Sequence, residues 1–381
     1  MVTDVARLAY SRRTRRGAAD TVSAHLSRLV VRGWQRVHTQ SHTHTHTESA
    51  LRASAGAAAS HPSAPIPVQG PPVGSAVRVA LGESGLSVFP LILGGAEFGW
   101  NVDLESSHDI LDAYLLRGGN AVHTSDAYSA GRSEHIIGQW LHSRGVRDDI
   151  VLTVRVGGHP DNPGLGPVSL VRAVEASLVR LDTDRIDVLT LDAMTDSATA
   201  LEDTLATVEW LVESGKVRAI GAAGYTAAQL VEARILSSAG YPRLTVLDVP
   251  FNVLRRHEFD ADLRLVAGAQ GMAVTPSHAL EHGFLSGRHR SRVRTGLSVR
   301  GAQMAAHLNR RGSRTLRALD EVGVELGVPD AAVAVAWLLS QRLVTAPIVN
   351  AYAPAHVEEL VQGVGVRLSR AQLAEIGRAS Q

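Results

Sequence analysis

The chain has 381 residues, of which 45% are hydrophobic, enough for one large barrel domain or two ordinary domains. Its formal net charge is +1, so the charge balance does not favour a nucleic-acid or membrane-surface partner. It contains no cysteine, which excludes disulfides, thiol catalysis and thiolate metal sites. No stretch is apolar enough to span a bilayer, and we expect a cytoplasmic protein.

Residues 1–75 differ in composition from the remainder of the chain. They contain the histidine-rich run SHTHTHTESA and a stretch rich in Ala, Ser, Pro and Gly. Such a sequence buries too little apolar surface to offset the entropy of ordering. We therefore predict a disordered N-terminal extension over residues 1–75 and one folded domain over residues 76–381. The alternating histidines are interpreted as low-complexity sequence in preference to a metal site.

From about Val77, short apolar runs alternate with longer segments whose apolar residues recur at helical spacing, as in residues 170–181. The runs are Leu91–Leu93, Ala121–His123, Ile150–Val156, Val188–Leu191, Ala219–Ala222, Thr245–Val249, Met272–Thr275 and Ala346–Val349. A strand followed by a helix, repeated eight times, predicts a (β/α)8 TIM barrel. Residues 84–88 indicate a small hairpin that closes the barrel floor. The arginine-rich segment 288–300 is expected to be a solvated surface loop.

The most informative motif begins in the second predicted strand. It reads HTSDAY from His123 to Tyr128 and continues as AGRSEHIIG over residues 130–138. Three further matches follow in order: the SL, RL, TD and ID pairs within residues 177–187, GKVRAIG at 215–221, and GFLSG at 283–287. Together these motifs resemble the aldo/keto reductase family over about residues 77–378. The resemblance implies the same barrel and an NADP(H)-dependent reduction of carbonyl groups.

The resemblance also implies four catalytic positions at the carboxyl ends of the strands. Tyr128 matches the family's proton-donating tyrosine, whereas His123 replaces its aspartate, Arg155 its lysine and Asp192 its histidine. Arg155 keeps a positive charge that favours a lower pKa for Tyr128. Asp192 is expected to pair with either His123 or Arg155. Two interpretations stay open: a reworked acid/base site, or a buried polar network in a barrel that has lost its reaction.

The positions that the resemblance implies for cofactor binding are mostly substituted as well. They are Ala223, Gly224, Asp248 and Phe251 near the nicotinamide, Leu280 near the pyrophosphate, and Asn350, Tyr352 and His356 after strand eight. Tyr352 replaces the arginine that pairs with the 2′-phosphate, so no charge remains there for this group. Trp100 stands where the family often has an apolar substrate-pocket residue, and packing is the alternative role.

We therefore expect an aldo/keto reductase-like barrel that has lost standard NADPH-dependent carbonyl reduction and uses no cofactor. It would bind a small molecule or a protein partner, or catalyse a cofactor-free acid/base reaction. The alternative is an active NADP(H)-dependent oxidoreductase with an atypical tetrad. No nucleic-acid, membrane or metal partner is predicted, and His278 and His282 are interpreted as polar residues at the rim of the site.

Overall fold

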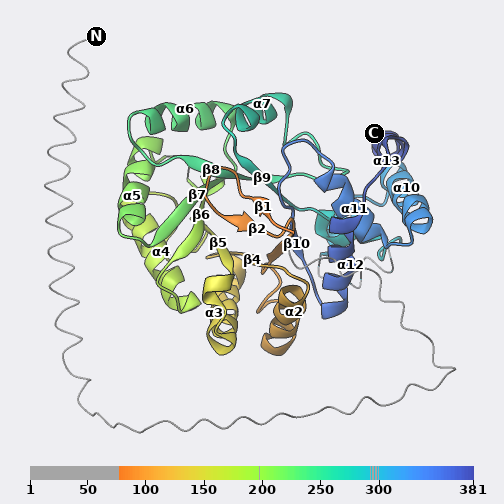
Figure 1. The fold of residues 1–381 in the computed structure, drawn as a ribbon, viewed down its shortest axis with the longest axis horizontal. Coiled ribbons are helices and arrows are strands. Elements are labelled where there is room, and N and C mark those ends of the chain that lie inside the picture. The colour runs from red at the N-terminus through yellow and green to blue at the C-terminus, as the bar shows by residue number, and fades with distance from the viewer. Residues whose placement is uncertain (1–76, 197, 292, 294–295, 297, 299) are drawn as a thin grey trace, which may run out of the picture. The chain divides into compact units, whose positions relative to one another are not determined.

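The computed structural model describes residues 77–381, apart from residues 197, 292, 294–295, 297 and 299. The predicted extension over residues 1–75 lies outside the described residues. The described part forms a parallel sheet with the order β10-β3-β4-β5-β6-β7-β8-β9, ringed by helices (Figure 1). Its strands are β3 (Ile92–Gly94), β4 (Ala121–Ser125), β5 (Val151–Val156), β6 (Ile186–Asp192), β7 (Val217–Ala223), β8 (Leu244–Pro250), β9 (Ala273–Ser277) and β10 (Ile348–Asn350).

The sheet is nearly closed into a barrel by the segment that precedes β10. The backbone N–H of Thr345 donates to the carbonyl of Val274 at 2.8 Å, and a parallel bridge joins Val274 to Val344. All eight predicted apolar runs coincide with strands, so the (β/α)8 prediction is confirmed.

Helices separate the strands and cover the outside of the barrel. They are α2 (Leu104–Leu116), α3 (Arg132–Arg144), α4 (Pro167–Leu181), α5 (Leu201–Glu213), α6 (Ala227–Ser238), α7 (Ala261–Ala269), α9 (Gly301–Ala305), α10 (Arg310–Leu326), α11 (Asp330–Leu339), α12 (Pro354–Gly365) and α13 (Arg370–Ala379). Short 3-10 turns are η1 (Tyr128–Gly131), η2 (Arg147–Asp149), η3 (Ala193–Thr195) and η4 (Glu281–Ser286). Among the described residues, no single helix is long and apolar enough to cross a bilayer; α10 and α11 satisfy that test only as a pair bent by 95°.

The barrel floor is filled by a hairpin and by side chains from the amino ends of the strands. Strands β1 (Val79–Ala80) and β2 (Ser87–Val88) pair antiparallel, as the sequence predicted for this segment. Leu81, Leu86 and Val88 pack against inward-facing strand residues such as Ile92 and Val246. A plugged floor leaves the carboxyl ends of the strands as the open end of the barrel.

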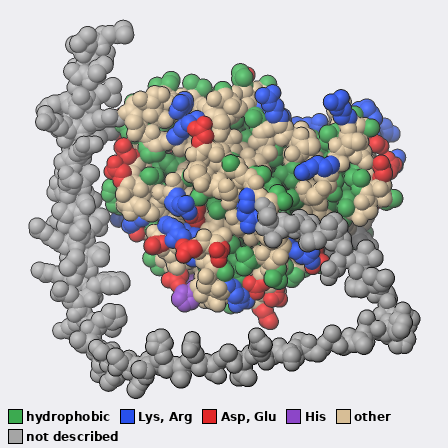
Figure 2. Space-filling view, viewed as in Figure 1, with side chains coloured by type: hydrophobic (Ala, Val, Ile, Leu, Met, Phe, Trp, Pro, Cys, Tyr) green, Lys and Arg blue, Asp and Glu red, His purple; other side chains and the backbone are tan. Residues whose placement is uncertain are grey.

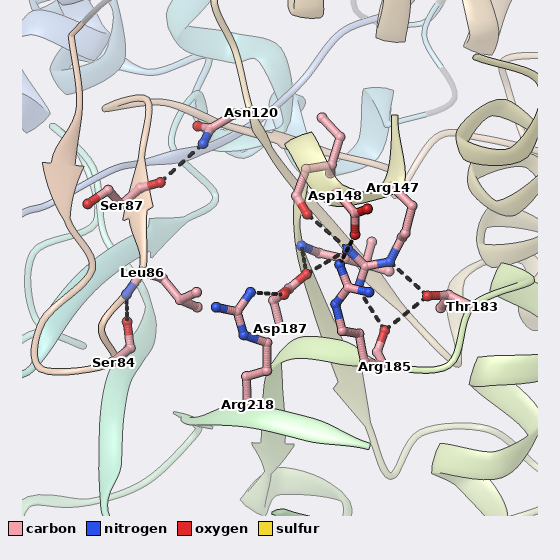
Figure 3. A network of polar contacts seen from close by, with 12 residues as sticks. Ser84, Leu86, Ser87, Asn120, Arg147, Asp148, Thr183, Arg185, Asp187 and Arg218 are labelled. Carbon is pink, nitrogen blue, oxygen red and sulfur yellow. Dashed lines mark hydrogen bonds and ion pairs between the residues drawn. The ribbon is translucent and has the colours of Figure 1, made fainter. Parts of the chain in front are cut away.

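The buried carboxylate of Asp187 also connects neighbouring strands at the barrel floor, as Figure 3 shows. Asp187, near the start of β6, is 1% exposed and accepts hydrogen bonds from Arg218 Nη1 at 2.8 Å and from the backbone N–H of Leu152 at 2.9 Å. Arg147 Nη1 lies 2.9 Å from the same carboxylate, and Arg147 Nε donates to the Thr183 hydroxyl at 2.8 Å. Two residues of the motif at 177–187 are therefore structural.

The Ser-Glu pair of the first motif is structural too. Ser133 Oγ donates to the carbonyl of Gly95 at 2.7 Å, which fixes the start of α3 against the loop after β3. Glu134 is fully buried and accepts a hydrogen bond from Arg180 Nε at 2.5 Å, which joins α3 to α4. Burial raises the pKa of Glu134, and the Ser177 hydroxyl and Arg180 only partly offset that effect.

Candidate functional site

The four predicted catalytic positions come together at the open end of the barrel. His123 lies on β4, Tyr128 begins the turn after β4, Arg155 lies on β5 and Asp192 ends β6. Because neighbouring parallel strands end at the same edge, side chains from their last residues converge there.

Tyr128 and Arg155 form the centre of this cluster. Arg155 Nη2 donates to Tyr128 Oη at 3.2 Å, and the guanidinium carbon lies 5.6 Å from the centre of the phenol ring. Burial raises the pKa of Tyr128, while the positive charge of Arg155 opposes this rise. The phenol is therefore neutral at pH 7 and retains its proton.

Two carboxylates flank the guanidinium of Arg155. Asp192 Oδ2 lies 3.6 Å from Arg155 Nε, and Asp248 Oδ2 lies 4.0 Å from Arg155 Nη1. The pKa of Arg155 is raised by Tyr128 and by both carboxylates. Of the two partners expected for Asp192, the structure shows Arg155. The neighbouring strand thus supplies the counter-ion that the substitution at position 123 removed.

His123 turns to a different partner. The residue is 3% exposed, and its Nδ1 lies 3.0 Å from the hydroxyl of Thr153 on β5. Burial, followed by the charge of Arg155, lowers the pKa of His123 to about 3, so the imidazole is neutral. The ring meets Tyr128 edge to face at 6.1 Å between centroids.

Asp248 on β8 is buried without a hydrogen bond to either carboxyl oxygen within the described residues. Burial raises its pKa, and the nearby Arg155 and Ser277 only partly offset this effect. A buried carboxyl group without a hydrogen bond costs folding free energy, and the contact with Arg155 at 4.0 Å is its one ion pair among the described residues.

A cavity of about 620 Å³ opens above the cluster. His123, Tyr128 and Arg155 form part of its wall. Four predicted cofactor positions from the segments after β9 and at or after β10 also line it, namely Leu280, Asn350, Tyr352 and His356. A single cavity therefore joins three of the four catalytic positions to the segment after β10, whereas Asp192 lies outside its lining.

Other predicted positions lie outside the lining of this cavity. Ala223 and Gly224 lie at the end of β7, where Met194 packs against Gly224, and Asp248 lies below the cavity. Phe251 is fully buried in the core against Phe259 and Trp337, with ring centroids 5.5 and 5.6 Å away, and does not line the cavity. Its assignment to the cofactor site stays a prediction.

Trp100 is 53% exposed and does not line the cavity. The guanidinium of Arg300 lies 5.0 Å from the centre of its ring, so Trp100 supports a lining residue from outside. Its role as a substrate-pocket residue stays a prediction.

Arg288 and Arg300 are among the lining residues that the sequence interpretation missed, because the segment 288–300 was expected to be solvated. Arg288 bonds to Glu359 on α12. Arg300 Nη2 lies 2.6 Å from Oε1 of Glu97, a residue that is 1% exposed. The arginine density of the segment was visible, but the sequence does not show which arginines turn inward.

A strained turn places two histidines in the cavity wall. His278 and His282 line the cavity with ring centroids 4.9 Å apart, and their φ angles are 54° and 58°. Burial is the main cause that lowers the pKa of both rings, that of His278 to about 4, so both are neutral at pH 7. Within the described residues, no three His, Asp or Glu side chains are placed to hold a metal ion.

Glu281 stabilises the turn. Its own backbone is in the left-handed region, with φ 46°, and the residue is 1% exposed. Its carboxylate accepts hydrogen bonds from Arg255 Nη2 at 2.7 Å and Asn252 Nδ2 at 2.6 Å, and lies 3.0 Å from His307 Nε2. Because αL backbone is unfavourable for side chains other than glycine, this network fixes a turn that the local sequence would not adopt alone.

Comparisons with known proteins agree with the fold. The chain is 31% identical over 322 residues to aldo-keto reductase ausK of Emericella nidulans, covering 78% of this chain and 79% of that protein. It is 31% identical to norsolorinic acid reductase stcV of the same fungus, covering 78% and 80%. A probable voltage-gated potassium channel subunit beta of Arabidopsis thaliana is 28% identical, covering 75% and 90%. The sequence profile of the Aldo/keto reductase family matches residues 90–381, and this chain belongs to that family.

Proposed function

We propose that this barrel binds a small molecule at its carboxyl end and does not carry out NADP(H)-dependent hydride transfer. The observation that supports the proposal is that the arginines in the cavity wall are already paired with carboxylates. Within the described part of the chain, each of the three that line the cavity already faces a carboxylate: Arg155 with Asp192, Arg288 with Glu359, and Arg300 with Glu97.

The phosphates of NADP(H) need cationic or N–H donors that are not already committed to other anions. The lining histidines with lowered pKa, His278, His282 and His356, are neutral and add no charge. A phosphate bound here would displace a carboxylate from its arginine and leave that carboxylate unpaired. The residues present therefore do not fit the cofactor that the family uses.

The nicotinamide side of the site supports the same proposal. Ala223 and Gly224 have no side-chain hydrogen-bonding groups, and the carboxyl group of Asp248 lies below the cavity. No side chain at these three positions offers a donor to the carboxamide oxygen when Asp248 is ionised.

An NADP(H)-dependent reductase is the second candidate, and one observation favours it. The Arg155–Tyr128 hydrogen bond keeps a cation beside the family's proton donor. Two of the relatives reported above are named as reductases. A reductase of this kind would have to bind phosphates with cations or N–H donors other than the paired arginines.

Restoring the family's catalytic residues separates the two candidates. We expect the triple variant His123→Asp, Arg155→Lys, Asp192→His to show no NADPH-dependent reduction of aromatic aldehydes, because the cofactor does not bind. The measurement is NADPH absorbance with a nitrobenzaldehyde substrate. A gain of steady turnover in this variant would contradict the proposal.

The matched control adds Tyr352→Arg and His356→Gln to the triple variant. These changes return a free guanidinium and an amide to the positions after β10. We expect this control to bind NADPH about tenfold or more tightly than the triple variant, because it gains one charge-assisted pair with a phosphate. Equal NADPH affinity of the two variants would show that the side chains at positions 352 and 356 do not limit NADPH binding.

A further inference from the structure

Two arginines outside the cavity lie over a row of buried aromatic rings. The rings of Trp337, Phe251 and Phe259 follow one another with centroids 5.6 and 5.5 Å apart. The guanidinium carbon of Arg256 lies 4.9 Å from the centre of the Trp337 ring. That of Arg264 lies 4.9 and 4.6 Å from the centres of Phe251 and Phe259. Because a guanidinium is attracted to the face of an aromatic ring, both charges are held over one continuous apolar surface.

A third arginine, Arg311 at the start of α10, joins this pair at the last residues of the chain. Arg311 Nε donates to the carbonyl of Ser380 at 2.7 Å, and Arg256 Nη2 donates to the hydroxyl of the same residue. Their other hydrogen bonds go to the backbone carbonyls of Leu254 at 2.8 Å and Val253 at 3.0 Å. These neutral acceptors fix the two guanidiniums near each other and supply no negative charge.

Within the described residues, none of these three arginines forms an ion pair with a carboxylate, whereas the neighbouring Arg255 forms two. Burial, followed by the charges of Arg311 and Arg264, lowers the pKa of Arg256. Burial also lowers the pKa of Arg264, and the charge of Asp260 only partly opposes this effect. Arg256 is thus repelled by two positive charges that no paired carboxylate offsets, and an anion bound there would relieve the repulsion.

The exposed face of α10 continues this positive surface. Arg310, Arg314 and Arg317 recur at a spacing of four and three residues, which places them on one face of the helix. All three are exposed, and none is ion-paired within the part of the chain that the structure describes. Figure 2 shows several Lys or Arg side chains at the end of the molecule where Figure 1 places α10 and α13.

We infer that this arginine surface binds a short acidic segment of a partner protein. The arginine surface consists of Arg256, Arg264, Arg310, Arg311, Arg314 and Arg317. Guanidinium groups bind carboxylates through paired N–H donors, so aspartate and glutamate side chains match the surface in charge and in geometry. The arginines are only partly buried, so a single anionic group gains little, whereas several carboxylates in one segment act together.

The residues around the arginine surface favour a short acidic segment over a nucleic acid. The stripe on α10 spans about 10 Å, the length of about three extended residues. Asp260 and Asp262 at the start of α7, and Asp320 and Glu321 further along α10, flank the arginines. These carboxylates would repel a polyanion that extends beyond the stripe. The aromatic rings under the arginines are buried, so they offer no exposed face on which a base could stack.

The test titrates a fluorescein-labelled octaglutamate peptide into the full chain at low ionic strength and follows fluorescence anisotropy. The variant replaces the exposed stripe through Arg310→Gln, Arg314→Gln and Arg317→Gln together. We expect the wild-type chain to bind the peptide and the variant to bind it about tenfold more weakly, because it loses three exposed ion pairs. Added salt should weaken wild-type binding as well.

The matched control changes the net charge by the same amount on other elements. It combines Arg78→Gln, Arg172→Gln and Arg234→Gln, which lie before β1, on α4 and on α6 and are exposed without an ion pair among the described residues. We expect the control to bind the peptide within about twofold of the wild-type chain, because its substitutions lie outside the arginine surface.

Three results would overturn the inference. They are a lack of saturable binding by the wild-type chain, an equal loss of affinity in the variant and the control, and tighter binding of a single-stranded DNA of the same charge. The last result would indicate a nucleic-acid partner instead. The inference does not depend on the proposed function, because none of the six arginines lines the cavity.

Discussion

At the scale of single residues, the substitutions at the catalytic positions form one rearranged charge cluster. Asp192 stands 3.6 Å from Arg155, so the negative charge lost at position 123 is regained on the next strand. His123 has left the ionic cluster and bonds to Thr153 instead. The sequence predicted that these residues would converge, and it left two partners open for Asp192. The direction of the Asp192 side chain decides between His123 and Arg155, and a sequence motif does not specify that direction.

Asp248 allows a test at this scale. Burial raises its folded-state pKa above the ordinary value of 3.8. Between the two values the folded state binds more protons than the unfolded state, so stability falls as pH rises through this window. Above the folded pKa the full cost of the buried charge remains. Asp248→Asn should therefore stabilise the protein at pH 8.

The expected gain for Asp248→Asn is about 1–3 kcal/mol, measured by urea unfolding at pH 8, and it should shrink in acid. Asp192→Asn is the control, because Asp192 faces Arg155 and also accepts from the N–H of Met194. That change should give no gain. A destabilised Asp248→Asn variant at pH 8 would mean that its charge is needed by Arg155.

At the scale of elements, the motif residues divide into those that build the barrel and those that line its cavity. Glu134 with Arg180 joins α3 to α4, and Asp187 joins β6 to its neighbours. These contacts explain why a sequence can keep the family's motifs while its catalytic positions change. Apolar runs predicted the strands because parallel barrel strands are buried on both faces. The inward turn of Arg288 and Arg300 depends on the path of a long loop, which periodicity does not describe.

Removing the floor carboxylate tests its structural role. Asp187→Ala leaves the Arg147 guanidinium and the N–H of Leu152 without their buried acceptor, and we expect a loss of about 3–5 kcal/mol in unfolding free energy. Asp148→Ala is the control, because Asp148 bonds to Arg185 from a position that is 89% exposed. Its removal should change the urea midpoint little. Equal losses in the two variants would refute the assignment.

The strained turn in η4 gives a second test at the scale of elements. His282 has φ 58°, so glycine tolerates the position better than alanine does. We expect His282→Gly to be about 1 kcal/mol more stable than His282→Ala, since both remove the same imidazole. Chemical unfolding of the two variants measures the difference. If the alanine variant is the more stable of the two, the turn is not strained in solution.

At the scale of the whole molecule, the contacts that stabilise the barrel and the cavity that would bind a ligand lie at opposite ends of the barrel. The hairpin and the Asp187 network close the amino end, whereas the cavity and the altered catalytic positions occupy the carboxyl end. The fold was predictable from the sequence because it depends on many apolar residues in a repeated pattern. The state of the site was predictable only in part, since it depends on which charged side chains meet across distant loops.

If the arginines of the cavity are committed to carboxylates, as proposed, the wild-type protein does not bind NADP(H). A titration of the full chain with NADPH and NADH, followed by tryptophan fluorescence, tests it most directly, because Trp100 contacts the cavity residue Arg300. We expect no saturable quenching by either nucleotide up to millimolar concentration. Saturable binding of NADPH at micromolar concentration would contradict it and establish a working cofactor site.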